Sequence, residues 1–166
     1  LLSSALEIWQ DAPVTLLREH YRCHPKIINF CNQKFYNGQL IVMTEDHNEP
    51  DVLIMYRTVA GNHAREKQNQ REIDVIEREI LPRLSQRSYR SIGIITPYND
   101  QVEAIRKQFE DTYEISTVHG FQGREQDAII LSSVDNVIRK FVNDPHMLNV
   151  AVSRAVHSLA VVTSQN

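Results

Sequence analysis

Short apolar runs recur along the chain and alternate with segments in which apolar residues lie three or four positions apart. The runs predict strands: VTLL (14–17), DVLIMYRT (51–58), SIGIIT (91–96), EISTV (114–118), DAIILSSV (127–134) and LAVVTS (159–164). Strands that are apolar along their whole length, with helices between them, are typical of a parallel sheet covered on both faces. The pattern therefore predicts a single α/β domain.

The wider apolar spacing predicts helices over 24–38, from 71 onward, from 99 onward and over 148–156. Pro25 suits the first turn of the first helix, and Pro82 should kink or shorten the second. Asn99 is expected to cap the third. The residues expected to face the core are Ile27, Ile28, Cys31, Phe35, Ile73, Ile76, Ile80, Leu84, Val102, Ile105, Phe109, Leu148, Val152 and Ala155. Residues 39–50 and 58–70 are expected to be loops.

Composition narrows the class of protein. With 166 residues, 42% hydrophobic and 23% charged, the chain is about one globular domain and has no run long enough to span a membrane. Its net charge of −3 gives no overall basic field for nucleic acid, although a groove can be locally basic. Two cysteines fit a reducing, cytoplasmic location. Residues 1–13 start without a methionine, within an amphipathic run, and are expected to connect a preceding domain to a domain over 14–166.

Polar segments flank several of the predicted strands. Arg18–Pro25, Thr96–Asn99 and His119–Glu125 each follow a strand, and Arg154 precedes the last one among small and apolar residues. Because ligands of open parallel sheets bind outside the carboxyl ends of the strands, we expect these segments to converge on one edge.

Arginine at such an edge suits phosphate, because its planar fork is permanently charged. A surface salt bridge is the alternative for Arg154, but its association with Arg22 and the Gly120–Gly123 loop favours phosphate. The sequence contains no G-x-x-x-x-G-K-[ST] loop and no acidic pair after a strand that would hold magnesium. The chain therefore has arginines for a phosphate and nothing to cradle it, as half of a site would.

Two other groups of residues have alternative interpretations. His20, Cys23, His24 and Cys31 are zinc-ligand types, but their spacing fits no standard site, so a packed cysteine and capping histidines are favoured. The Thr96-Pro97-Tyr98 stretch fits either a nucleic-acid track or an ordinary strand-to-helix turn.

Four blocks occur in order along the chain: REHYRCHPKIINFCNQKFYNGQL, IGIITPYNDQ, ISTVHGFQGREQDAIILSSV and LNVAVSRA. Together they resemble motifs IV to VI of superfamily 1 helicases, in the branch of the nonsense-mediated-decay RNA helicase and the replication helicase-nucleases. The resemblance runs from about Val14 to Thr163. It implies a RecA-like parallel sheet with helices on both faces, as the second of two motor domains, the one that lacks the phosphate-binding loop.

The resemblance also implies an ATP site between this domain and a preceding RecA-like domain of the same chain. That preceding domain would hold the phosphate-binding loop and the Mg²⁺ ligands, so no metal ligand is expected here. The implied catalytic residues are Arg22 and Arg154, both at the γ-phosphate. The implied nucleotide-binding residues are Tyr21, on the adenine, with Gln122, Gly123 and Glu125.

Single-stranded DNA or RNA is the implied polymer, with contacts from Thr96, Pro97, Tyr98, Thr117 and His119. No membrane partner is expected, and the isolated chain is expected to be inactive as an ATPase. The alternative is a non-catalytic nucleic-acid-binding module with the same fold.

Some positions depart from the family pattern. His119 stands where aspartate is frequent in this branch, and Asp135 where a basic residue commonly follows the strand. Ser153 replaces threonine, and Val156 stands where a basic residue is frequent. None of these departures touches Arg22, Glu125 or Arg154.

Overall fold

The computed structural model describes residues 15, 17–59, 64–110, 112–121, 123–135 and 144–164. Its main feature is a five-stranded sheet in which all neighbours are parallel, in the order β3-β9-β8-β6-β7. The strands are β3 (Leu53–Arg57), β6 (Ile92–Thr96), β7 (Glu114–Thr117), β8 (Gln126–Ser132) and β9 (Ala155–Thr163). The predicted α/β class with a parallel sheet is confirmed.

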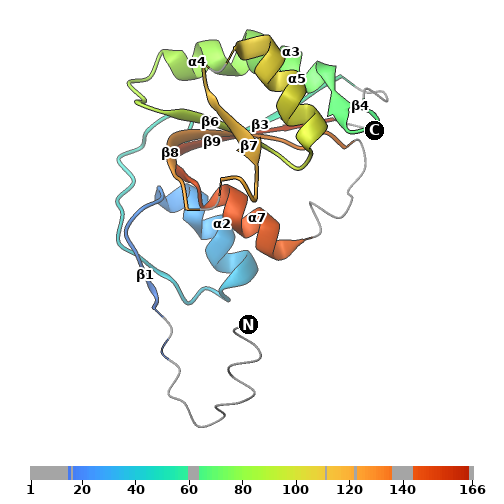
Figure 1. Ribbon diagram of the computed structural model, residues 1–166. Helices are drawn as coiled ribbons and strands as arrows, with labels where there is room; N and C mark the ends of the chain where they lie inside the picture. Colours follow the sequence, from blue (N-terminus) through green and yellow to red (C-terminus); the bar gives the residue numbers. More distant parts are fainter. Residues whose placement is uncertain are drawn as a thin grey trace, which may run out of the picture.

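Helices cover both faces of the sheet (Figure 1). On one face lie α2 (Pro25–Phe35) and α7 (Pro145–Val152); on the other lie α3 (Gln70–Val75), the π-helix η1 (Ile76–Ile80), α4 (Leu81–Ser85) and α5 (Asn99–Phe109). Two buried clusters fill the two interfaces, and neighbouring residues of β8 serve different ones: Ile129 joins the α2–α7 side and Ile130 the other. This two-sided burial explains why the strands are apolar throughout.

The hydrophobic pattern did not predict the short strands. Among the described part of 14–17, Thr15 and Leu17 lie outside any strand, so the prediction there is wrong. The first strand is instead β1 (Glu19–His20), which pairs in parallel with β2 (Ile41–Val42) inside a predicted loop. Likewise β4 (Ala64–Arg65) and β5 (Gln68–Asn69) form a hairpin within 58–70. Such strands are held by backbone hydrogen bonds and bury little apolar surface, so no periodicity marks them.

Pro82 is accommodated by a wide turn in a continuous helical segment. The Leu81 N–H donates to the Ile76 carbonyl five residues back, and Pro82 then falls in the first turn of α4. A proline ring normally clashes with the preceding turn of an α-helix, and the π-helical turn relieves that conflict. The predicted buried face is retained, since Ile73, Ile76, Ile80 and Leu84 are all buried.

Two predicted helix ends are wrong. The cap of α5 is Tyr98, Asn99 is the first helical residue, and no side chain caps this end. Helix α7 ends at Val152, and Ala155 already begins β9, so Arg154 lies in the connecting turn. The residues after Val152 (Ser-Arg-Ala-Val-His-Ser) show neither a clear helical nor a clear strand period, so spacing alone does not locate this boundary.

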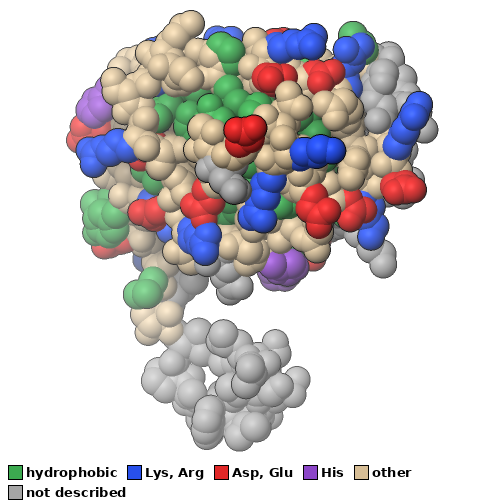
Figure 2. Space-filling view, turned by 45° about the horizontal axis from the view of Figure 1, so that its top comes forward, with side chains coloured by type: hydrophobic (Ala, Val, Ile, Leu, Met, Phe, Trp, Pro, Cys, Tyr) green, Lys and Arg blue, Asp and Glu red, His purple; other side chains and the backbone are tan. Residues whose placement is uncertain are grey.

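Surface charge is mixed. On the face shown in Figure 2, acidic and basic side chains are interspersed and do not gather by sign, in keeping with the small net charge. In the part of the chain that the structure describes, no helix combines the length and apolarity needed to cross a membrane.

Candidate nucleotide site and nucleic-acid face

The predicted site residues lie at two opposite ends of the sheet. Thr96 and Thr117 end β6 and β7, whereas Glu125 and Arg154 immediately precede β8 and β9. All these strands are parallel, so the first pair lies at the carboxyl end and the second at the amino end, roughly 20–26 Å away at 3.3 Å per residue. The expected convergence on one edge is therefore wrong.

At the amino end, four residues meet that come from three distant segments of the chain. Arg22 Nη2 donates to the Ser153 carbonyl at 2.9 Å, and Arg22 Nη1 lies 3.3 Å from Glu125 Oε2. We call Arg22, Glu125, Ser153 and Arg154 the amino-end cluster. It brings together both predicted catalytic arginines and the predicted nucleotide carboxylate.

The Arg154 guanidinium is held by backbone carbonyls. Its Nε donates to the Val150 carbonyl and its Nη1 to the Arg124 carbonyl, both at 3.2 Å. Burial, followed by the positive charge of nearby Arg22, lowers the pKa of Arg154. Only Arg22 forms an ion pair with the exposed Glu125 carboxylate, and Arg22 Nε is buried with no hydrogen-bond partner among the described residues. Positive charge and donor capacity are both in excess here.

The segment from β7 to β8 connects the two ends. It starts at the carboxyl end of β7, packs Val118 and Phe121 into the core on the α2–α7 side, and reaches the amino end of β8. Gly123 has φ +81°, a left-handed conformation that glycine adopts without strain, and a Cβ on Gly120 would lie 1.9 Å from Ser116 Oγ. Gln122 lies outside the described residues.

Tyr21 directly precedes Arg22 in the sequence; the residue is 64% exposed, and its hydroxyl donates to Glu19. Cys23 is fully buried; its backbone N–H donates to His20 Nε2, and its thiol donates to the Ser153 carbonyl. Burial raises the pKa of the Cys23 thiol and raises that of Cys31 to about 12. The cysteines are thus packing residues, and Cys31 lies on the buried face of α2 as predicted.

At the carboxyl end, the predicted strand-contact residues differ in access. His119 is exposed, and Pro97, Tyr98 and Thr117 are half-buried. Thr96 has no exposed surface, and its buried hydroxyl has no partner among the described residues. Its side chain does not reach the surface of the domain, and the contact between Thr96 and a strand stays a prediction. Tyr98 Oη donates to Asp135 Oδ2 at 2.6 Å.

Sequence reasoning missed a buried polar network beside this end. Glu72, with no exposed surface, accepts hydrogen bonds from the hydroxyls of Ser132, at 2.7 Å, and Ser133, at 3.2 Å, and from the Val134 N–H at 3.0 Å. Asn69 caps α3 and donates to the Val134 carbonyl at 2.9 Å. The N-x-x-E spacing of a helix start was a visible signal, but it does not reveal that the carboxylate is buried.

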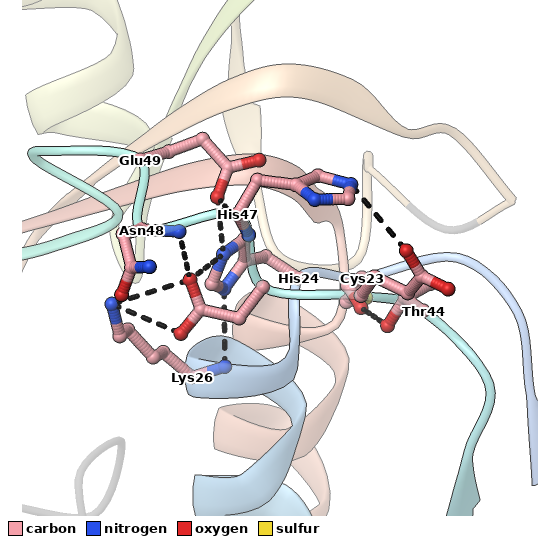
Figure 3. A network of polar contacts seen from close by, with 9 residues as sticks. Cys23, His24, Lys26, Thr44, His47, Asn48 and Glu49 are labelled. Atoms are coloured by element: carbon pink, nitrogen blue, oxygen red, sulfur yellow. Dashed lines mark hydrogen bonds and ion pairs between the residues drawn. The ribbon is translucent and has the colours of Figure 1, made fainter.

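One grouping of potential metal ligands occurs among the described residues: His24, Asp46 and Glu49 (Figure 3). His24 caps α2, and its Nδ1 accepts the Lys26 N–H at 3.1 Å. A neutral imidazole accepts at one nitrogen only, so Nε2 carries the proton and points it at Glu49, 3.3 Å away. Metal ligation through Nε2 would remove the cap. We therefore interpret the group as an anchor for the loop before β3, which agrees with the predicted capping role of histidine.

A family described as an AAA domain matches residues 1–166. The chain belongs to this family. It is 29% identical over 177 residues to an uncharacterized ATP-dependent helicase of Methanocaldococcus jannaschii, covering 92% of this chain and 27% of that protein. It is 28% identical over 183 residues to a regulator of nonsense transcripts 1 homolog of Neurospora crassa, covering 92% and 17%.

Among solved structures, the C-terminal domain of a possible DNA helicase from Lactobacillus plantarum matches with a TM-score of 0.57 and 16% identity over 87% of both chains. At that identity the match shows the fold alone. The RecA-like fold and the resemblance to helicases are confirmed, and this AAA domain spans 27% and 17% of the lengths of these two curated relatives.

Proposed function

We propose that this AAA domain is the second RecA-like motor domain of an ATP-dependent helicase, formed by residues 14–166 and joined by 1–13 to the preceding domain. It supplies Arg22 and Arg154 to an ATP site whose phosphate-binding loop and Mg²⁺ ligands belong to that domain. Mg²⁺ bound there would neutralise phosphate charge during transfer. Tyr21, Gln122, Gly123 and Glu125 complete the nucleotide contacts on this side.

The amino-end cluster carries the proposal. Two guanidinium groups lie together with a single exposed carboxylate, and a buried Arg22 Nε lacks a partner. An anion placed between the arginines would relieve their mutual repulsion and accept their remaining N–H groups. Phosphoryl transfer proceeds largely by this kind of positioned charge, which makes the cluster suited to a γ-phosphate.

The carboxyl end provides the proposed contacts to single-stranded DNA or RNA, through Pro97, Tyr98, Thr117 and His119. The segment from Val118 to Glu125 links this end to the amino-end cluster. Its buried Phe121 makes it part of the core, so a shift at one end is transmitted to the other. ATP binding and strand binding are thereby coupled within one domain.

The test is strand-stimulated ATP hydrolysis by the full-length protein. Arg154→Ala should lower kcat by about 10³–10⁵-fold and leave the affinity for a single-stranded oligonucleotide nearly unchanged. Arg124→Ala is the matched control, because this exposed arginine pairs with Glu114 instead. Normal turnover by Arg154→Ala would refute the role in hydrolysis. Strand binding by a wild-type protein without ATPase activity would favour a non-catalytic binding module.

A further inference from the structure

The strand β8 ends in an unusual turn. Val134 has φ +67°, a left-handed conformation that is an outlier for a β-branched residue. The Asp135 N–H donates to the Ser133 carbonyl at 2.8 Å, two residues back, which gives a γ-turn of the rare, strained kind. Strain of this sort persists only where the surroundings impose it, and it is concentrated at functional sites.

In this protein the conformation of Val134 is imposed by hydrogen bonds to both its N–H and its carbonyl group. Glu72 accepts the Val134 N–H at 3.0 Å, and the Asn69 side-chain amide donates to the Val134 carbonyl at 2.9 Å. Both residues belong to the start of α3, and neither has any exposed surface. The start of α3 therefore holds the turn in place through these two buried side chains, an interaction that we call the grip of α3 on the turn.

The turn places the Asp135 carboxylate beside the Tyr98 hydroxyl. Asp135 is the residue immediately after the gripped peptide, and its Oδ2 accepts the Tyr98 hydroxyl at 2.6 Å. Tyr98 in turn is the cap residue of α5. A carboxylate beside a phosphate backbone would repel it, so a role for Asp135 through Tyr98 is chemically more suitable than a direct contact.

We propose that Glu72 and Asn69 are positioning residues for strand binding: they hold the Val134 turn so that Asp135 fixes Tyr98 against single-stranded nucleic acid. The strand part of this statement rests on the proposed function, whereas the grip on the turn does not. Glu72 and Asn69 lie behind the surface and touch no ligand.

Two conservative variants test the proposal in the full-length protein. Glu72→Gln keeps the shape but replaces one of the two acceptor oxygens with an NH2 donor, so the Ser132, Ser133 and Val134 donors compete for a single oxygen. Asn69→Ser keeps a capping oxygen for α3 and loses the donor to the Val134 carbonyl. Asp127→Asn is the matched control, because Asp127 accepts a backbone N–H, that of Arg90, at the amino end.

The first measurement is hydrogen exchange of the Val134 and Asp135 amides, which needs no ligand. Exchange should accelerate at least about tenfold in both variants and stay unchanged in Asp127→Asn. Unchanged exchange in folded Glu72→Gln and Asn69→Ser would overturn the proposed grip.

The second measurement is fluorescence anisotropy with labelled poly-dT and poly-U oligonucleotides of about 20 nucleotides, longer than the roughly 4–16 nucleotide footprint of a single binding fold. Each variant should bind about tenfold more weakly, with KM for ATP unchanged. Adding Tyr98→Phe to Glu72→Gln should weaken binding less than the product of the single effects, because both act through one contact.

Faster exchange with unaltered strand affinity, or fully multiplicative effects, would overturn the positioning role. A wild-type protein that binds neither oligonucleotide would refute the proposed function instead, and the exchange data would still decide whether α3 grips the turn.

Discussion

The two ends of the sheet hold polar residues under opposite conditions. At the amino end, Arg22 and Arg154 lie close together, Arg22 pairs with a Glu125 side chain that is 56% exposed, and Arg22 Nε has no partner among the described residues. Near the carboxyl end, Glu72 is fully buried and saturated by hydroxyl and amide donors. The amino end of the sheet, which we call the open end, has hydrogen-bonding capacity left for a ligand. The buried network around Glu72, which we call the closed network, has none. Function and fold stability should therefore respond separately to substitutions at the two ends.

Arg22→Lys should break function at the open end with little effect on the fold. A lysine cannot bond the Ser153 carbonyl and a phosphate in the same fork-like geometry, so kcat for ATP should fall by about 10²–10³-fold. The free energy of unfolding should change by less than about 0.5 kcal/mol, because the pair with Glu125 is largely exposed. Steady-state ATPase assays and urea unfolding measure the two quantities, with Arg124→Lys as control. A kcat within twofold of wild type would contradict the cluster's role.

Glu72→Ala should do the reverse. It leaves the Ser132 and Ser133 hydroxyls and the Val134 N–H without their acceptor and opens a cavity, so the free energy of unfolding should fall by about 2–4 kcal/mol. Urea unfolding of the 166-residue chain, followed by circular dichroism, measures this loss. Glu79→Ala, at an exposed position of the same helical segment, should change it by less than about 0.5 kcal/mol. Equal losses in the two variants would mean that the network stabilises nothing.

This contrast also explains what the sequence predicts and what it does not. Apolar periodicity located the sheet and the helix faces, because burial of residues such as Ile129 and Ile130 on both sides leaves a continuous apolar run. Periodicity carries no information about whether a polar residue is buried. The burial of Glu72 and of Thr96 could therefore not be predicted from it.

The candidate site residues could be selected by type, but their placement could not be predicted. Arg154 and Glu125 stand before strands, so the rule that ligands bind at carboxyl ends assigned them to the wrong end. The rule describes where loops after strands gather. Here the segment around Phe121 returns across the sheet and carries Glu125 to the opposite end, a connection that depends on tertiary packing.

The pH dependence of the free energy of unfolding should test the closed network further, through the protonation of Glu72. Burial raises the pKa of Glu72 above its ordinary value of 4.5, so the folded state binds this proton more tightly than the unfolded chain. The stabilising contribution is complete below pH 4.5 and is lost as the pH rises through the higher folded pKa. Glutamine does not titrate, so the stability of wild type minus that of Glu72→Gln should be larger near pH 4.5 than near pH 7, by about 1.4 kcal/mol for each pH unit of pKa shift.

Urea unfolding at a series of pH values measures this difference. Asp51, whose pKa is lowered by hydrogen bonds from Arg83 and Arg87, gives a slope of opposite sign, but it is common to both proteins and cancels. A difference that grows with pH would show that the hydrogen bonds to the carboxylate outweigh the cost of its burial.

The smallest effect should come from His24, which sharpens the comparison because it is a purely structural residue at the open end. Its Nδ1 caps α2 next to Arg22, so His24→Ala should lower the free energy of unfolding by about 0.5–2 kcal/mol, whereas His24→Asn, which retains a capping acceptor, should lose less. Urea unfolding without zinc measures the contribution of the cap to stability. Urea unfolding with zinc tests the assignment of the proton to His24 Nε2. Because a bound metal would have to displace the Nε2 proton and break the cap, zinc should not stabilise the wild-type protein. A zinc-dependent rise in stability that disappears in His24→Asn would show that His24, Asp46 and Glu49 form a metal site after all.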